Sequence, residues 1–491
     1  METILRIALF SVLLNTMACA QPITSHYQQL AAEYQTYKEK KITHRRFKHQ
    51  DILPIIQTLP KPFTVAQAGS SIEGRGIYSI TIGSGKTTVL LWSQMHGDES
   101  TATMALFDIF RFFQANDKFN DLRKDLLSAL KIVFVPMLNP DGAERFQRRN
   151  ALGVDLNRDA LRLQCPESQL LKQLRDDLQA DWGFNLHDQN RYYAAGRNPS
   201  AAAISFLAPA FNYQKDTNPI RAKSMQMIGY MNGVLQQYIP RQVARYNDDF
   251  EPRAFGDNIQ KWGTSTILIE SGGIPGDWEK QELRKLNFIA IMAALEAIAA
   301  DQVDDFPIAA YEQIPFNESN AFHDVVLREV KVENNGKWYT VDVGIRRKEV
   351  GGGTAIPYYY DADIQDLGDL STFYAYESIN GKGKQLVPGK VYEQVLPDWK
   401  AVKQLDVKGL WQKGITTLRL AQLPPNDIAG RIPFRLIPAT QKKEEVILPG
   451  YNPALVLKEG NQVKQLIING FVYDLARTDS QRMNWWIGIG I

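Results

Sequence analysis

The first 300 residues alternate between two hydrophobic patterns. Short runs rich in β-branched and apolar residues predict buried strands, and segments with an apolar residue every three or four positions predict amphipathic helices. The clearest strands are expected at 87–94, 131–139, 182–187 and 264–271, and the clearest helices at 101–116, 167–179, 221–239 and 278–300. Strands that alternate with helices favour an α/β domain whose mostly parallel or mixed central sheet is flanked by helices.

The pattern changes after about Asp301. Short alternating segments follow one another, separated by Gly, Pro and Asn-Gly turns, as in an all-β sandwich or barrel. We therefore expect an α/β domain over residues 21–300 and a β-rich accessory domain over residues 301–491. The accessory domain shows no arrangement of residues that predicts chemistry.

Residues 1–20 have the features of a signal peptide. A short charged start precedes an apolar stretch, and Ala18 and Ala20 give the small-x-small pattern of cleavage before Gln21. The alternatives are a buried N-terminal helix and a lipid anchor at Cys19, although residues 16–18 match the anchor pattern poorly. We expect an exported protein, periplasmic or secreted. Cleavage would leave Cys165 alone, so no intrachain disulfide is expected.

Composition excludes some partners. The chain has 491 residues, 44% of them hydrophobic, and a formal net charge of +2. This charge favours neither nucleic acid nor an anionic membrane surface as a partner. After the N-terminus, no stretch of about 18 uninterrupted apolar residues predicts a membrane span.

Two candidate motifs lie within residues 79–100. Gly85, Lys86 and Thr87 could end a phosphate-binding P-loop, but Ile80 stands where its first glycine belongs. A strand pattern follows Lys86, whereas a P-loop opens a helix. We therefore interpret "GSGK" as a hairpin turn between two strands.

The second motif is "HGDE", which places His96 three residues before Glu99. It follows a predicted strand and opens a predicted helix, so both side chains can converge at the carboxyl edge of the sheet. A pair at this spacing is by itself equally typical of a solvated helix start. Two further predicted strands end with His187 and with Glu270, and "NPDG" follows another. Parallel strands bring such ends to one edge, where two histidines and a carboxylate suit zinc.

The motifs "HGDE", "NPDG", "RRN…GVDLNR", "NLH" and "IES" occur in this order and together resemble the zinc carboxypeptidases, a metallocarboxypeptidase family, over roughly residues 60–300. The resemblance implies that His96, Glu99 and His187 hold one zinc ion, and that Glu270 is the general base. The structural alternatives are hydrogen-bonded core histidines, a helix-start charge and a salt-bridged glutamate. His26, His44, His49 and His323 lie outside the pattern and are interpreted as surface or structural residues.

The resemblance also implies roles in substrate binding. Arg148 resembles the arginine that stabilises the oxyanion, because the family places it two residues before the position of Asn150; Arg145 and Arg149 are its neighbours. Asn157 and Arg158 resemble the pair that binds the substrate's terminal carboxylate, with loop bracing as the alternative.

The family also has a tyrosine on a mobile loop. Tyr246 is the nearest candidate, and Tyr230 and Tyr238 compete with it. The specificity pocket should come from the same stretch, which includes Phe255 and Asp257.

The implied function is an exported zinc metallocarboxypeptidase acting on peptides with a free C-terminus. The alternative is a zinc amidase or deacylase on the same fold, acting on peptidoglycan stem peptides or N-acyl amino acids; "NPDG" favours peptides. A non-catalytic binding protein would normally lack the base or a ligand, and both are present. The sequence does not specify the preferred terminal residue, exo or endo cleavage, or the oligomeric state.

Overall fold

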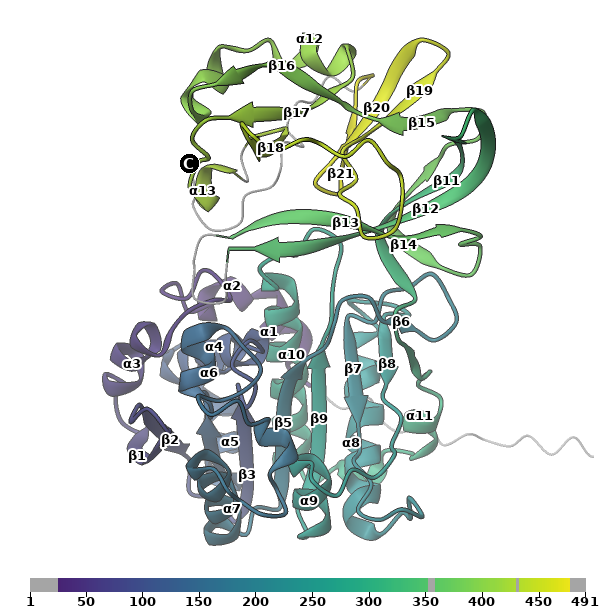
Figure 1. The fold of residues 1–491 in the computed structure, drawn as a ribbon. Coiled ribbons are helices and arrows are strands. Elements are labelled where there is room, and N and C mark those ends of the chain that lie inside the picture. Colours follow the sequence, from purple (N-terminus) through teal and green to yellow (C-terminus); the bar gives the residue numbers. More distant parts are fainter. Residues whose placement is uncertain (1–24, 352–357, 430–431, 477–491) are drawn as a thin grey trace, which may run out of the picture.

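The computed structural model describes residues 25–351, 358–429 and 432–476. The predicted signal peptide, with Cys19, therefore lies outside the described residues. An α/β unit forms the lower part of the molecule in Figure 1, and a β-rich unit built from residues after 320 lies above it. Among the described residues, no helix is both long and apolar enough to cross a lipid bilayer.

The α/β unit is built on a mixed sheet of eight strands in the order β1-β2-β4-β3-β5-β9-β7-β8. The four central strands are parallel to one another, and β2 and β7 pair antiparallel with the outer two of them, β4 and β9. The bounds are β1 (Thr64–Ser70), β2 (Gly76–Ile82), β3 (Thr87–Ser93), β4 (Leu130–Val135), β5 (Trp182–Asp188), β7 (Ile204–Leu207), β8 (Val243–Arg245) and β9 (Ser265–Ser271). The predicted fold class is confirmed by this strand order.

Helices cover both faces of the sheet, as the continuous apolar runs of its central strands require. Val89 and Leu91 of β3 face one core, with side chains of α4, α8 and α10, whereas Leu90 and Trp92 face a second core with α7 and α9. The bounds are α4 (Thr101–Gln114), α7 (Pro166–Leu178), α8 (Pro219–Leu235), α9 (Phe255–Lys261) and α10 (Gln281–Ala299). Further helices are α1 (Tyr27–Ala32), α2 (Tyr34–Tyr37), α3 (His49–Gln57), α5 (Asn120–Ala129) and α6 (Pro140–Arg145).

The hairpin predicted at "GSGK" is wrong. The flanking strands β2 and β3 are not neighbours, because β4 lies between them. The segment instead packs against the end of α5, where Gly85 donates its backbone N–H to Leu130. A Cβ at Gly85 would lie 1.9 Å from the carbonyl carbon of Ala129, so close backbone approach explains the glycine. The strand that follows rules out a P-loop helix.

The α/β unit extends beyond residue 300. α11 (Ala309–Glu312) packs on α8, and β10 (Asn317–Glu318) pairs with β6 (Ala194–Ala195). The fold therefore changes character close to residue 320, about twenty residues later than the composition shift suggested.

The C-terminal unit, here called the β domain (residues 321–476), contains a sheet ordered β13-β12-β11-β15-β19-β20-β21, with β14 also paired to β11. A smaller sheet has the order β16-β17-β18. The bounds are β11 (Phe322–Asn334), β12 (Lys337–Val350), β13 (Tyr359–Gly368), β14 (Tyr374–Asn380), β15 (Gln385–Pro388), β16 (Lys390–Leu396), β17 (Ile415–Leu420), β18 (Arg435–Pro438), β19 (Leu455–Glu459), β20 (Gln462–Ile468) and β21 (Phe471–Asp474).

The sequence predicted an all-β domain, but the β domain also contains short helices. The strands β16 and β17 are parallel, and parallel neighbours need a crossover connection. The chain makes this crossover through a 3₁₀ turn and the helix α12 (Val407–Gln412), and α13 (Asn426–Ala429) precedes β18.

Candidate metal centre

Two neighbouring strand ends bring the three predicted zinc ligands together. His96 and Glu99 lie on the turn that joins β3 to α4, and His187 is the penultimate residue of β5. A Cβ at Gly97 would lie 2.0 Å from the backbone of Gly142, so only glycine allows the "HGDE" turn to pack against the "NPDG" segment. Asn139 of that segment caps α6 by accepting a hydrogen bond from the Gly142 amide.

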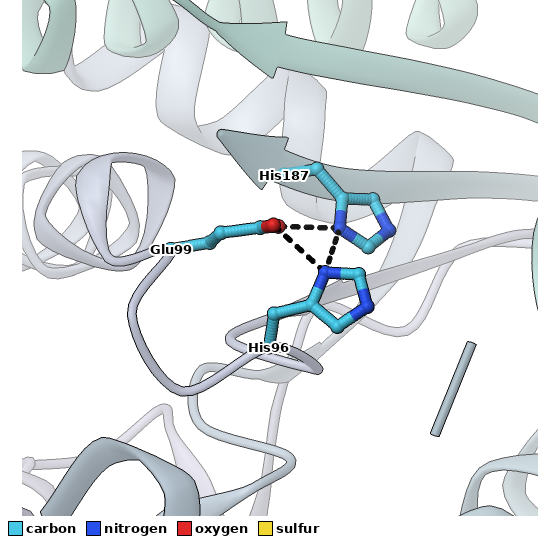
Figure 2. A group of neighbouring side chains, drawn as sticks. All are labelled: His96, Glu99 and His187. Carbon is cyan, nitrogen blue, oxygen red and sulfur yellow. Dashed lines mark hydrogen bonds and ion pairs between the residues drawn. The ribbon is translucent and has the colours of Figure 1, made fainter. Parts of the chain in front are cut away.

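Figure 2 shows both imidazole rings facing one carboxylate. The Nδ1 atom of His96 lies 2.8 Å from Oε1 of Glu99, and Nδ1 of His187 lies 2.7 Å from Oε2. The two Nδ1 atoms are 3.2 Å apart. The imidazoles are nearly inaccessible, with 2% and 1% of their side-chain surfaces exposed.

These distances fit a single metal ion. A tetrahedral zinc ion with bonds of about 2.1 Å separates its nitrogen and oxygen ligands by roughly 3.4 Å. Two histidines and one carboxylate are also a known catalytic zinc set, with a fourth position left for water. Among the described residues, these three are the His, Cys, Asp or Glu side chains that form a group of three or more able to hold a metal ion, and their ligand atoms all lie within 4.8 Å of one another.

The electrostatics of the metal-free cluster favour a cation. Burial opposes protonation of His96, but the charge of Glu99 and a hydrogen bond to Asp155 raise its pKa to about 9. Burial lowers the pKa of His187, which suits a neutral ligand. The two imidazoles outweigh the burial of Glu99 and hold the pKa of its carboxyl well below the ordinary range. The carboxylate therefore stays ionised.

Glu270 lies beside this cluster because β9 pairs with β5 in a register that places it opposite His187. Burial and the charge of Glu99 raise its pKa well above the ordinary value. Its Oε2 atom is buried and has no hydrogen-bond partner among the described residues. A carboxyl group with a raised pKa and a buried oxygen that makes no hydrogen bond is typical of a proton-transfer residue.

Arg148 is the arginine of its segment that reaches the cluster. Its Nη1 lies 3.1 Å from Nδ1 of His96 and 3.3 Å from Oε1 of Glu99. The alternatives point elsewhere, since Arg145 pairs with Glu73 and Arg149 donates to the carbonyl of Gly153. The geometry thus separates three arginines that the sequence could separate only by resemblance.

Asp155 belongs to the site, although the sequence analysis gave it no role. Its Oδ1 lies 3.1 Å from Nε2 of His96, and its Oδ2 accepts from Nε of Arg148 at 3.0 Å. One carboxylate thus orients both a candidate ligand and a candidate anion-binding group, as supporting carboxylates at metal sites commonly do. Its place in "GVDLNR", two residues before Asn157, was the available signal.

Asn157 and Arg158 lie on a 3₁₀ turn next to α9. The Oδ1 atom of Asn157 accepts a hydrogen bond from the Phe255 amide, which ties the turn to the start of α9. Nε of Arg158 lies 3.5 Å from Glu251, and 38% of its side chain is exposed. The guanidinium is therefore accessible to an anionic ligand.

The three candidate tyrosines lie in different places. Tyr246 packs against Tyr193, with tilted rings whose centroids are 5.7 Å apart, and burial and the nearby charge of Glu270 raise its pKa. Tyr230 stacks on Phe306, and Tyr238 packs on the helical core. Tyr246 is therefore the tyrosine near the cluster. Burial raises the pKa of Asp257, close to Arg158, to about 7.

The remaining described histidines lie outside the cluster. His26 pairs with Glu296, and His49 contacts the carbonyl of Gly76 through Nε2. His44 has a buried Nδ1 without a hydrogen-bond partner among the described residues, and His323 is buried in the β domain.

Comparison with known proteins points to one family. Residues 53–202 match the family model described as zinc carboxypeptidase, a stretch that includes His96, Glu99, His187 and Arg148 but ends before Glu270. The chain is 29% identical over 121 residues to carboxypeptidase D of Mus musculus, covering 21% of this chain and 9% of that protein. It is 30% identical over 135 residues to carboxypeptidase 2 of Trichophyton rubrum, covering 27% of this chain and 24% of that protein. The chain thus spans a quarter or less of the length of these curated relatives.

Two solved structures are similar at low identity. A metallo-carboxypeptidase from Burkholderia cenocepacia has a TM-score of 0.41 and 19% identity, covering 52% of this chain and 68% of that chain. Bovine thrombin-activatable fibrinolysis inhibitor has a TM-score of 0.44 and 14% identity, covering 55% of this chain and 99% of that chain. The fold class of the present protein rests on its own strand order. Residues 53–202 of this chain are thus similar in sequence to the zinc carboxypeptidase family.

Proposed function

We propose that this protein is an exported zinc-dependent metallocarboxypeptidase that hydrolyses the C-terminal peptide bond of its substrates. The observation that carries the proposal is the convergence of His96, Glu99 and His187 within bonding reach of one ion, with an unpaired Glu270 beside them. A single zinc ion held by these three residues would polarise the scissile carbonyl and lower the pKa of a water ligand toward about 7.

Glu270 is assigned as the general base. Its raised pKa, caused by burial and by the charge of Glu99, suits a carboxylate that takes a proton from the attacking water and passes it to the leaving nitrogen. Its Oε2 makes no hydrogen bond within the described part of the chain, so the atom is available to hold that proton.

Arg148 is assigned to the oxyanion. Its Nε is held by Asp155, which leaves the Nη1 end of the guanidinium directed at the ligand cluster. A fixed cation at this point stabilises negative charge that develops on the carbonyl oxygen.

Asn157 and Arg158 are assigned to the terminal carboxylate of the substrate, with Tyr246 beside Glu270 as a further substrate contact. An exposed guanidinium can bind a carboxylate through two parallel hydrogen bonds. Together these residues select a peptide with a free C-terminus.

The test uses the zinc-loaded protein and a pair of peptides that differ only in a free or amidated C-terminus. We expect single residues to be removed stepwise from the free peptide alone, as measured by mass spectrometry. A chelator should abolish this activity, and added zinc should restore it. Metal analysis should give one zinc per chain. Cleavage of neither peptide by zinc-loaded protein would overturn the peptidase assignment and leave the amidase or deacylase alternative, tested with stem peptides and N-acyl amino acids.

A matched pair of arginines tests the carboxylate grip. Arg158 and Arg253 both pair with Glu251 and are both exposed. We expect Arg158→Ala to raise KM for the free peptide by about 10-fold or more, a hydrogen bond to a charged group contributing about 1.5–3 kcal/mol, and Arg253→Ala to leave KM unchanged. Equal effects of the two substitutions would show a general charge effect.

Export has its own test. Expressing the full chain in a bacterial host and sequencing the N-terminus of exported protein should give Gln21 as the first residue. Retention of the intact N-terminus would contradict signal cleavage.

A further inference from the structure

Two segments that leave the metal centre contact the β domain. Three residues beyond β5, which carries His187, Arg191 contacts Asp324 of β11. The segment beyond β9, which carries Glu270, meets the β domain at Gly273, where a Cβ would lie 2.7 Å from the hydroxyl of Tyr376. The β domain therefore touches both segments within a few residues of the proposed ligand and base.

Asp324 is the centre of the first contact. Its side chain has no exposed surface, and its Oδ1 lies 2.9 Å from Nη2 of Arg191. Its Oδ2 accepts hydrogen bonds from the hydroxyl of Tyr192 at 2.6 Å and from the Arg347 amide at 2.7 Å. Burial opposes ionisation, but the charges of Arg191 and Arg347 hold the pKa of Asp324 below its ordinary value. One buried carboxylate thus joins the segment after His187 to two strands of the β domain.

Arg191 extends this contact to the segment after Glu270. Its guanidinium lies between the rings of Trp278 and Tyr376, 4.6 Å from each centroid. Trp278 belongs to the segment that follows β9, and Tyr376 belongs to β14. The hydroxyl of Tyr376 also donates to the backbone carbonyl of Arg191 at 2.6 Å. The two segments and the β domain are therefore packed around one arginine.

A second contact reaches the segment of Glu99. Glu349 of β12 pairs with Arg45 and Arg46. The backbone of Arg45 in turn accepts from the hydroxyl of Ser100, the residue after Glu99, at 2.5 Å and donates to Glu279 at 2.7 Å. The segment that carries Glu99 is thus connected to the β domain, as are the segments that follow His187 and Glu270.

Strand ends and the loops beyond them are the places where a sheet opens most easily. His187 and Glu270 are each the penultimate residue of their strand. A contact just beyond them opposes this opening, and a misplacement of about 1 Å at a catalytic centre can cost 100-fold in rate.

Resting on the function proposed above, we propose that the β domain positions the metal centre and that Asp324 is its principal positioning residue. Asp324 acts through Arg191 and Tyr192 on the segment after His187, and does not itself touch the metal or the substrate.

The test compares Asp324→Asn with a matched control, Asp342→Asn. Asp342 lies on β12, accepts from Nη1 of Arg328 at 3.0 Å and from the Glu329 amide at 2.9 Å, and has all these partners inside the β domain. For Asp324→Asn we expect a fall in kcat of about 10- to 100-fold with little change in KM, and a similar fall in zinc affinity measured against a chelator. Hydrogen exchange in the metal-free protein should become faster at residues 188–193 and 272–280. Asp342→Asn should leave all three readouts at wild-type values.

Equal behaviour of the two variants would overturn the inference. If Asp324→Asn fails to fold, Tyr376→Phe removes only the hydroxyl bonded to the Arg191 carbonyl, and its exchange rates at the same residues decide the question. If the wild-type protein cleaves no peptide, the proposed function fails, but zinc affinity and hydrogen exchange still test the positioning role.

Discussion

Two buried carboxyl groups show how the two regions of this molecule differ. Glu270 in the α/β unit has a buried oxygen without a hydrogen-bond partner among the described residues, and burial with the charge of Glu99 raises its pKa. Asp324 in the β domain is also buried, but Arg191, Arg347 and Tyr192 surround it, and the two arginines hold its pKa low. Each carboxyl has one buried oxygen without a hydrogen-bond partner among the described residues, but only Asp324 has arginines within ion-pair distance.

The difference indicates that the two carboxyl groups have different roles, one in chemistry and one in structure. A buried carboxyl without partners costs stability, and a fold keeps such a group where it does chemistry. A buried carboxyl with charged partners holds a geometry, and removing one member of such a group is costly. The surroundings of the two carboxyl groups differ in the same way. Glu270 lies beside the cluster of His96, Glu99 and His187, whereas Asp324 joins a segment of the α/β unit to the β domain.

The strongest test of the comparison is Glu270→Gln. Removing a general base should lower kcat by about 100- to 10,000-fold. Zinc content should be unchanged, and stability should be unchanged or higher, because an unpaired carboxyl is replaced by a neutral group. Peptide turnover, metal analysis and thermal unfolding measure the three quantities. Wild-type turnover in this variant would remove Glu270 from the chemistry.

Asp324→Asn should have the opposite effect on stability. Loss of a buried charge leaves Arg191 and Arg347 without their partner, at a cost of about 3 kcal/mol in the free energy of unfolding. Chemical denaturation of the metal-free protein measures it, with Glu270→Gln alongside. The contrast between the two carboxyl groups would not survive if Glu270→Gln were the more destabilised.

Asp155→Asn probes a carboxylate that combines both features, since it is satisfied yet touches the site. The amide keeps the shape but loses the charge that orients His96 and Arg148. Zinc affinity should fall by about 10- to 100-fold, as for other supporting residues of metal ligands. Chelator competition measures the affinity, and Asp342→Asn is the control. An unchanged affinity would limit Asp155 to bracing its loop.

His323 gives the smallest effect and tests the β domain alone. Burial lowers its pKa to about 4, and both ring nitrogens lack hydrogen-bond partners among the described residues. The unfolded chain, with a pKa near 6.5, therefore binds the proton more tightly, and stability should be lost as pH falls from 6.5 toward 4.

We expect this residue to account for about 2 kcal/mol of the loss, allowing for partial solvation. Denaturation at pH 7 and pH 4.5 measures the loss, and His323→Phe should lose less stability across that interval than wild type. An equal loss in both proteins would assign the acid sensitivity to other groups.

Local pattern was sufficient for much of the α/β unit. Alternating apolar runs predicted β3, β5 and β9, and parallel strand ends implied that His96, His187 and Glu270 share an edge. The pattern failed where pairing is non-local. It placed a hairpin at "GSGK", because adjacent strands are the default, whereas β4 lies between β2 and β3. It also missed the crossover helix α12, which a parallel pairing requires.

The sequence by itself determined the chemistry available to this protein, because residue types at fixed spacing after apolar strands limit what can converge at a sheet edge. Only the tertiary structure decided that Arg148 rather than Arg145 or Arg149 reaches the cluster, and that Asp155 orients both Arg148 and His96. It alone joined Tyr192 to Asp324 across 132 positions of the chain. Such contacts depend on how two folded units pack, and no local pattern of hydrophobic and polar residues specifies that packing.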